Sequence, residues 1–82
     1  MARSLIKKLI MPTPNKIKNT VNHIRLAKNV TQEELAIAVG VTRQTIIAIE
    51  KGNYIPSVLL ALNIAKFFRT PVENIFTLSY EK

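Results

Sequence analysis

Two helix-start signals lie close together in the middle of this 82-residue chain, and they constrain its fold more than any other feature. Thr31, with Glu34 three residues later, has the pattern of a capping box, and Thr42 is a suitable cap for a second helix. Gly40 is suited to end the first of these helices in the left-handed conformation. Because only Val41 then intervenes, no loop is available to bring the two helices antiparallel, and we expect them to cross at a steep angle.

The sequence before this pair of helices carries the positive charge of the chain. The formal net charge is +7, and all of this excess falls in residues 1–30, which contain no acidic residue. Such a field attracts a polyanion, although a basic, solvated tail is the alternative. The chain has no cysteine, and no apolar run is long enough to cross a bilayer. Since lysines also interrupt the apolar start, we expect a cytoplasmic protein.

Periodicity in the rest of the chain predicts an all-α fold of five helices with a short C-terminal β-strand. A first helix is expected to begin at residues 15–18 and to run to Lys28, with Ile17 on its inner face. The fourth helix, over residues 58–68, is so apolar that it should be central. One inward stripe of this helix is expected to consist of Val58, Ala61, Leu62, Ala65 and Phe68. The fifth helix is a single turn opened by a capping box at residues 70–73.

Side chains suited to reading DNA bases fall on the outer face of the third expected helix. Ile46 and Ile49 lie on its inner face, which leaves Arg43 and Gln44 outward in its first turn. In the major groove, Arg43 can fork onto guanine and Gln44 can present both amide groups to adenine. Ile47 also faces outward, where it either contacts a thymine methyl group or is a stray apolar surface residue.

Residues 31–57 resemble the Xre/Cro–C1 family of repressors, most of all its very short members, which consist of little more than one helix-turn-helix. The resemblance extends over about residues 18–78, and the first seventeen residues have no counterpart in it. It implies a lambda-repressor-like domain that binds double-stranded DNA. The motifs that carry it are TQEELA at residues 31–36, GVTRQTI at 40–46 and IEKGNYIPS at 49–57.

Matching positions of that family imply roles for individual residues. Base reading would fall to Arg43, Gln44, Ile47 and Ala48. Phosphate contacts would fall to Gln32, Thr42, Thr45, Lys51, Asn53 and Tyr54. Arg25 and Glu50 would form an ion pair that we interpret as mainly structural, with a phosphate contact by Arg25 as the alternative.

We divide the chain into a basic N-terminal extension (1–17), a helix-turn-helix domain (18–76), and a C-terminal strand and tail (77–82). Residues 76–80 alternate between apolar and polar, which predicts a strand. This strand pairs either with its symmetry mate in a dimer or with residues 3–11, unless the tail folds over its own core. Residues 5–10 are either a strand added to the C-terminal sheet or a short basic amphipathic helix, and their lysines could reach an adjacent groove or phosphates as basic arms do. The candidates for a dimer interface are Phe76, Leu78, Tyr80, Leu60, Ile64 and Phe67.

The sequence therefore predicts a sequence-specific, double-stranded DNA-binding transcriptional regulator. Since one helix-turn-helix reads about half a site, we expect a repressor that binds a pseudo-palindromic operator as a homodimer. The alternative is an antitoxin of a toxin–antitoxin pair, which also represses its own operon and has a toxin as its partner. Helix starts account for Glu33, Glu34 and Glu73, and no nucleophile–base pair is visible, so we expect no enzyme, no cofactor and no metal.

Overall fold

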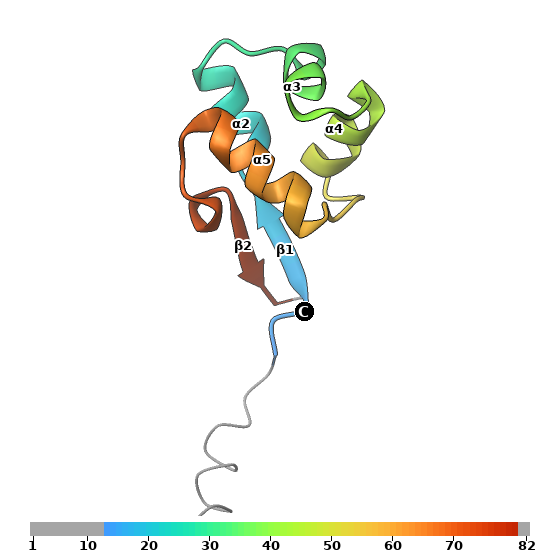
Figure 1. Cartoon of the computed structure of the whole chain (residues 1–82). Coiled ribbons are helices and arrows are strands. Elements are labelled where there is room, and N and C mark those ends of the chain that lie inside the picture. The colour runs from blue at the N-terminus through green and yellow to red at the C-terminus, as the bar shows by residue number, and fades with distance from the viewer. Residues whose placement is uncertain (1–12, 81–82) are drawn as a thin grey trace, which may run out of the picture.

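Two β-strands from the two ends of the described chain pair with each other and project from a bundle of helices (Figure 1). The computed structural model describes residues 13–80. None of the helices in this range has the length and apolarity that crossing a bilayer requires. In chain order the elements are the strand β1 (Lys16–Asn19), the helices α2 (Val21–Ala27), α3 (Gln32–Val39), α4 (Arg43–Glu50) and α5 (Val58–Phe68), the 3-10 helix η1 (Val72–Asn74) and the strand β2 (Phe76–Ser79).

The predicted caps set the starts of α3 and α4. The Thr31 hydroxyl accepts a hydrogen bond from the Glu34 amide at 3.0 Å, and the Glu34 carboxylate accepts one from the Thr31 amide at 2.8 Å. Thr42 caps α4 by accepting from the amide of Thr45 at 3.2 Å. Gly40 ends α3 with a φ of 76°, a conformation in which a side chain would be strained. The prediction of two helices joined by a minimal turn is confirmed.

The prediction of five α-helices in an all-α fold is wrong. Residues 13–80 contain four α-helices and a two-stranded antiparallel sheet. The segment expected as the fifth helix is η1, a 3-10 turn of three residues. Ile75, directly after it, is buried in the core, and β2 begins at Phe76, so the chain has no residues left for an α-helical turn.

The first part of the predicted N-terminal helix is instead the strand β1, and α2 begins only at Val21. The Asn19 side chain marks the change, because its carboxamide oxygen accepts from the Val21 amide at 3.1 Å. Ile17, which was expected on a helix, pairs with Leu78 of β2. The predicted C-terminal strand is confirmed, and its partner is β1 of the same chain. The other partner considered from the sequence, residues 3–11, lies outside the described residues.

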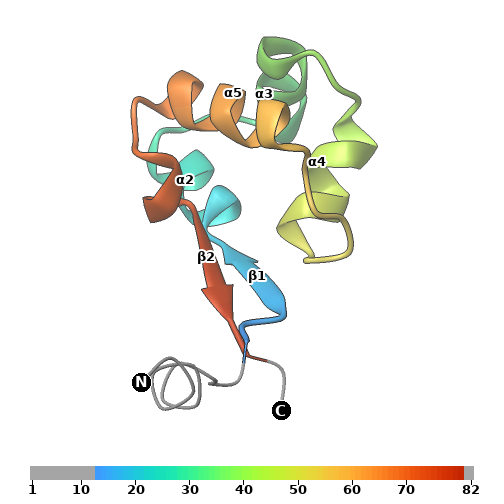
Figure 2. The ribbon, with the colours of Figure 1, turned by 60° about the horizontal axis from the view of Figure 1, so that its bottom comes forward.

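The core surrounds α5, which packs against α3 and η1. Figure 2 shows α5 running across the bundle from the α2 side to the α4 side. Val58 and Leu62 were expected inward but are 76% and 50% exposed, because α5 turns Leu60, Ile64 and Phe68 inward at every fourth position. The buried apolar residues are Val21, Leu35, Ala36, Ile46, Ile49, Leu60, Ile64, Ala65, Phe68 and Ile75.

Candidate nucleic-acid interface

The first turn of α4 is uncovered. The helix is held on its inner face by Ile46 and Ile49, which are completely buried, whereas Arg43 and Gln44 are exposed. The two other expected base-reading positions are half-buried, and they are Ile47 and Ala48. A helix that is fixed on one side and open on the other is suited to insertion into the major groove of a duplex.

A buried ion pair ties the end of α4 to α2. Arg25 Nε donates to Glu50 Oε2 at 2.7 Å, and Arg25 Nη2 donates to Glu50 Oε1 at 3.2 Å. The third nitrogen, Nη1, donates to the carbonyl oxygen of Val30 at 2.8 Å. The side chains of Arg25 and Glu50 are only 8% and 6% exposed. All three guanidinium nitrogens of Arg25 are therefore engaged within the protein, where they support the position of α4.

The Glu50 carboxylate accepts hydrogen bonds from two further side chains. Asn22 Nδ2 and Gln32 Nε2 each donate to Glu50 Oε1 at 3.1 Å. Burial by itself would raise the pKa of Glu50. Three influences outweigh burial and lower this pKa below its usual 4.5. They are the hydrogen bonds from Arg25, the hydrogen bonds from Gln32 and Asn22, and the positive charge of Arg25. Glu50 is therefore ionised at neutral pH and holds three side chains from α2 and α3 around the end of α4.

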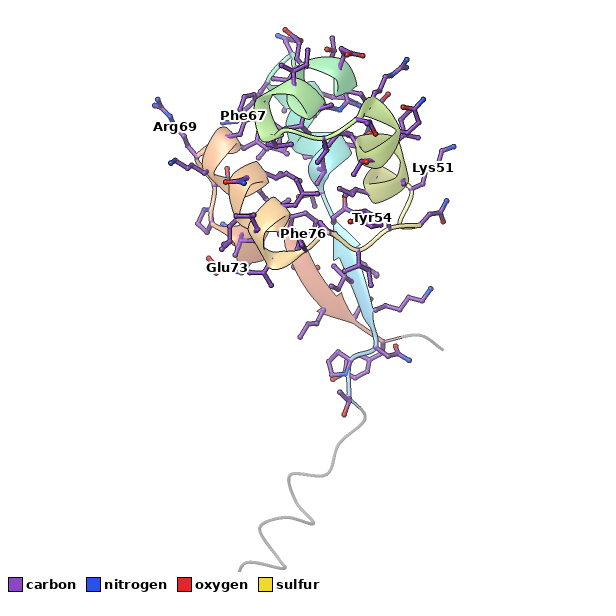
Figure 3. All side chains as sticks on the ribbon, turned by 45° about the vertical axis from the view of Figure 1, so that its right-hand side comes forward. Lys51, Tyr54, Phe67, Arg69, Glu73 and Phe76 are labelled. Atoms are coloured by element: carbon purple, nitrogen blue, oxygen red, sulfur yellow. The ribbon has the colours of Figure 1, made fainter. Side chains whose placement is uncertain are left out.

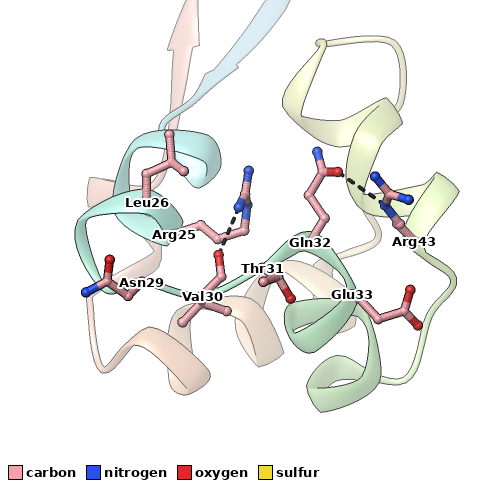
Figure 4. A pocket seen from close by; sticks show the side chains of 8 residues that line it. All are labelled: Arg25, Leu26, Asn29, Val30, Thr31, Gln32, Glu33 and Arg43. Carbon is pink, nitrogen blue, oxygen red and sulfur yellow. Dashed lines mark hydrogen bonds between the residues drawn. The ribbon is translucent and has the colours of Figure 1, made fainter.

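Gln32 connects this network to the exposed turn of α4 (Figure 4). Since the Gln32 amide nitrogen donates to Glu50, its oxygen faces Arg43, whose Nε lies 3.4 Å away. A hydrogen bond of this length biases the Arg43 guanidinium without fixing it. Both side chains line an open hollow of about 720 Å³ between the end of α2 and the starts of α3 and α4. The N-terminus of α3 and Arg43 favour an anionic group in this hollow, whereas the Glu33 side chain, which also lines it, opposes one.

The remaining expected phosphate positions border the two ends of α4. At its start, the hydroxyl groups of Thr42 and Thr45 are hydrogen-bonded to each other at 3.1 Å. After its end, the backbone amides of Lys51 and Asn53 donate to α4 carbonyl oxygens, so the turn is held against the helix. Figure 3 labels Lys51 and Tyr54 on this part of the surface. The exposed side chains of the set are Thr42, Lys51, Asn53 and Tyr54, and the half-buried ones are Gln32 and Thr45.

Sequence reasoning missed two asparagines that position this surface. Asn22 holds Glu50, as described above, and Asn19 Nδ2 donates to the carbonyl oxygen of Ile49 at 2.9 Å, which fastens β1 to the last turn of α4. Asn19 had a usable signal, because asparagine just before an apolar run is typical of a helix start. Asn22 had none, since its partner is distant in the sequence and no spacing marks it.

Two of the side chains predicted for a dimer interface are not accessible to a partner. Ile64 is completely buried and Leu60 is 8% exposed, because both lie on the inner face of α5 in the core of the chain itself. The other candidates are Phe67, Leu78 and Tyr80, which are exposed, and Phe76, which is half-buried. Exposed large aliphatic side chains that were not among the candidates are Leu26, Ile37, Ile55, Val58, Leu59 and Leu62.

The family model for the helix-turn-helix class HTH_3 matches residues 22–75, which include α3 and α4 and more than half of the chain. The chain belongs to the Cro/C1-type helix-turn-helix family. This is a family of DNA-binding transcriptional regulators and not a class of enzymes. The resemblance to the Xre/Cro–C1 regulators, stated from the sequence motifs, is confirmed.

Similar proteins carry names that agree with this family. The chain is 57% identical over 60 residues to an HTH-type transcriptional regulator of Methanocaldococcus jannaschii, with 73% of this chain and 91% of that protein covered. It is 51% identical over 65 residues to the HTH-type regulator YgzD of Bacillus subtilis, covering 79% and 98%. The CTXphi transcriptional repressor RstR of Vibrio cholerae is 31% identical over 55 residues, covering 67% and 50%.

A solved structure also resembles this fold. The restriction-modification controller protein C.AhdI from Aeromonas hydrophila superimposes with a TM-score of 0.63 at 26% sequence identity. The match covers 66% of this chain and 82% of the controller protein. The likeness of fold therefore extends over most of that protein.

Proposed function

We propose that this protein is a transcriptional repressor that binds a pseudo-palindromic operator as a homodimer. The proposed DNA-binding unit is residues 18–76, flanked by the extension 1–17 and the tail 77–82. Bases are read from α4 by Arg43, Gln44, Ile47 and Ala48. Phosphates are held by Gln32, Thr42, Thr45, Lys51, Asn53 and Tyr54.

The observation that carries this proposal is the exposure of Arg43 and Gln44 on a helix whose opposite side is completely buried. Bidentate contacts with bases need donors and acceptors in a fixed frame. The core packing of Ile46 and Ile49 supplies that frame for α4. Contacts to phosphates at both ends of the helix would then set its register in the groove, while the outward side chains specify the sequence.

A homodimer accounts for apolar side chains that remain on the surface. Leu78 is 70% exposed on β2, and Val58 and Leu59 are 76% and 71% exposed at the start of α5. Groups of exposed apolar side chains, unlike single ones, are typical of protein contacts. Two copies would also place two α4 helices about one turn of DNA apart, roughly 34 Å, as a two-fold site requires. The proposed interface consists of Phe67, Phe76, Leu78 and Tyr80, to which we add Val58 and Leu59.

Repression is supported by the names of the relatives. One relative is a transcriptional repressor, and two others are HTH-type transcriptional regulators. None of these three is named as an antitoxin, so the antitoxin alternative has no support from them. A regulator of this kind represses by occupying its operator, which it would reach in the cytoplasm.

The experiment that tests the proposal combines selection of duplexes from random DNA with sedimentation of the selected complex. We expect one preferred duplex with two inverted half-sites, bound by two chains, and reduced expression of a reporter that carries this duplex across its promoter. Leu78→Lys and Val58→Lys should dissociate the dimer and weaken operator binding. Ala27→Lys adds the same charge at an exposed position of α2, to which the proposal assigns no contact, and should do neither. Binding of a single chain, or no preferred duplex, would contradict the proposal.

A further inference from the structure

The two faces of the β1–β2 ribbon differ in chemistry. Side chains alternate between faces along a strand, and residues directly opposite each other in an antiparallel pair share a face. One face carries Ile17, Leu78, Asn19 and Phe76. The other face carries Lys16, Ser79, Lys18 and Thr77. The second face, which we call the lysine face, is polar and basic, because β1 and β2 contain no acidic residue.

The ribbon is fastened to the turn that follows α4. The carbonyl oxygen of Ile49 accepts two hydrogen bonds, one from the Gly52 amide and one from Asn19 Nδ2, each at 2.9 Å. The end of β1 and the turn therefore meet at a single oxygen atom. Gly52 lies between Lys51 and Asn53, two of the proposed phosphate contacts. The root of the ribbon is thus placed directly beside the surface along which a DNA backbone would run.

Lys18 lies one residue along β1 from this anchor, a step of about 3.3 Å. Its side chain is exposed and forms no ion pair with any residue in the described range 13–80. Phosphates of one DNA strand follow each other every 3.4 Å or so along the helix axis. Lys18 leaves the opposite face of the ribbon from Asn19, whose side chain is bonded to the turn. β1 is the strand on the α4 side of the ribbon (Figure 1), so the long, flexible side chain of Lys18 can bend around this edge toward a backbone that passes Lys51 and Asn53.

We propose that the lysine face of the ribbon is a second phosphate-binding surface, in which Lys18 extends the contacts around Lys51 and Asn53 to the flanking DNA backbone. This inference rests on the proposed function, because it requires a duplex that lies on α4. The ribbon then serves two partners, with the exposed Leu78 of one face toward a second copy of the chain and the lysine face toward DNA. Lys18 contributes affinity without base preference, since phosphate contacts carry no direct sequence information.

The salt dependence of operator binding by the full-length Lys18→Gln variant tests this inference, with Lys66→Gln as the matched control. Lys66 is an exposed lysine of α5 that lines a hollow with Phe67 and Arg69. Figure 3 shows Phe67 and Arg69 on the opposite side of the bundle from Lys51. Each variant removes one positive charge, so a general effect of net charge is the same in both. Fluorescence anisotropy with the selected duplex would be measured over a range of salt concentrations.

In Lys18→Gln we expect the slope of log affinity against log salt to become shallower by about 0.9 per protomer, or about 1.8 for the dimer. Binding in 0.1 M salt should weaken by tens of fold, or roughly 60-fold if both contacts are lost completely. Lys66→Gln should retain the wild-type slope, and Lys18→Arg should do so because it keeps the charge. The sequence selected by Lys18→Gln from random DNA should be unchanged.

Equal slopes and affinities for Lys18→Gln and Lys66→Gln would overturn the inference. A changed base preference in Lys18→Gln would also overturn it, because it would indicate base reading rather than phosphate binding. If the wild-type protein selected no duplex, the proposed function would fail and this inference would fail with it. If the wild-type protein binds its duplex but Lys18→Gln behaves like Lys66→Gln, only the contact between the ribbon and DNA is refuted, and the proposed function stands.

Discussion

Glu50→Gln should strongly destabilise the fold, because it leaves the Arg25 guanidinium without its counter-charge in a buried site. The two side chains are 8% and 6% exposed. The Glu50 carboxylate accepts two hydrogen bonds from Arg25 and one each from Asn22 and Gln32. Glutamine has the same shape, but it is neutral, and one of its two terminal groups is a donor. At least one of the present donors would therefore face another donor.

Removing one partner of a buried ion pair costs about 3–5 kcal/mol. Domains of this size have a total stability of about 5–15 kcal/mol, so the variant would lose a large share of it. At about 4–8 °C per kcal/mol, its melting temperature should fall by about 12–40 °C. Replacing both partners, as in Arg25→Met with Glu50→Leu, removes both buried charges and should cost less than about 1 kcal/mol.

Urea unfolding followed by circular dichroism measures these differences in a double-mutant cycle of Arg25→Met and Glu50→Leu, with Glu50→Gln beside it. All proteins must be compared at one chain concentration, because the proposed dimerisation would contribute to stability. If a single variant fails to fold while the double variant folds, the prediction is supported. A cost below about 1 kcal/mol for Glu50→Gln, or a double variant as unstable as the single ones, would refute the reasoning.

Two further predictions concern pH and helix capping. The folded-state pKa values of Glu50 and Glu34 lie below 4.5, so the stabilisation from their ionised forms is complete above that pH and is lost as the pH falls through the lowered values. In thermal melts, the melting temperature should decrease from neutral to acidic pH. This decrease should be smaller in the double variant at Arg25 and Glu50, and parallel profiles of the two proteins would contradict the prediction. Thr31→Ala should lower the free energy of unfolding by about 1 kcal/mol in urea titrations, whereas Thr31→Ser keeps a hydroxyl that accepts from the Glu34 amide. Equal stability of the alanine and serine variants would show that the cap contributes nothing.

The helix-turn-helix could be predicted from the sequence because its signals are local. The cap at Thr31, its partner Glu34 and the left-handed Gly40 act within one or two helical turns, and the structure confirms each of them. The outward position of Arg43 and Gln44 follows from the spacing of the same short helix. Local hydrogen bonding and helical periodicity were sufficient for this part of the candidate site.

The sheet could not be predicted in the same way, because it depends on pairing between the two ends of the chain. Ile17, Val21 and Ile24 have a spacing that fits one helix, and only the pairing of Ile17 with Leu78 decides in favour of a strand. A nearly all-apolar helix poses a related problem. More than one face of α5 can be turned inward by periodicity alone, and Val58 proved to lie outside.

The polar network of the site was only partly accessible to sequence reasoning. The pairing of Arg25 with Glu50 was implied by family resemblance and not by the residues themselves. Asn22 and Gln32 meet Glu50 from two different helices, and such a meeting depends on how the helices pack. Contacts of this kind require the three-dimensional structure, because no periodicity in the sequence encodes them.

Base reading by α4 is tested most directly by selecting bound sequences from random duplex DNA with Arg43→Ala beside the wild-type protein. Arg43 is exposed and makes one hydrogen bond of 3.4 Å within the protein, so the variant should fold normally. We predict that it loses about 1–3 kcal/mol of discrimination at one base pair of each half-site and keeps its preference elsewhere. A folded variant that selects the same sequence with the same discrimination at every position would contradict base reading by this helix.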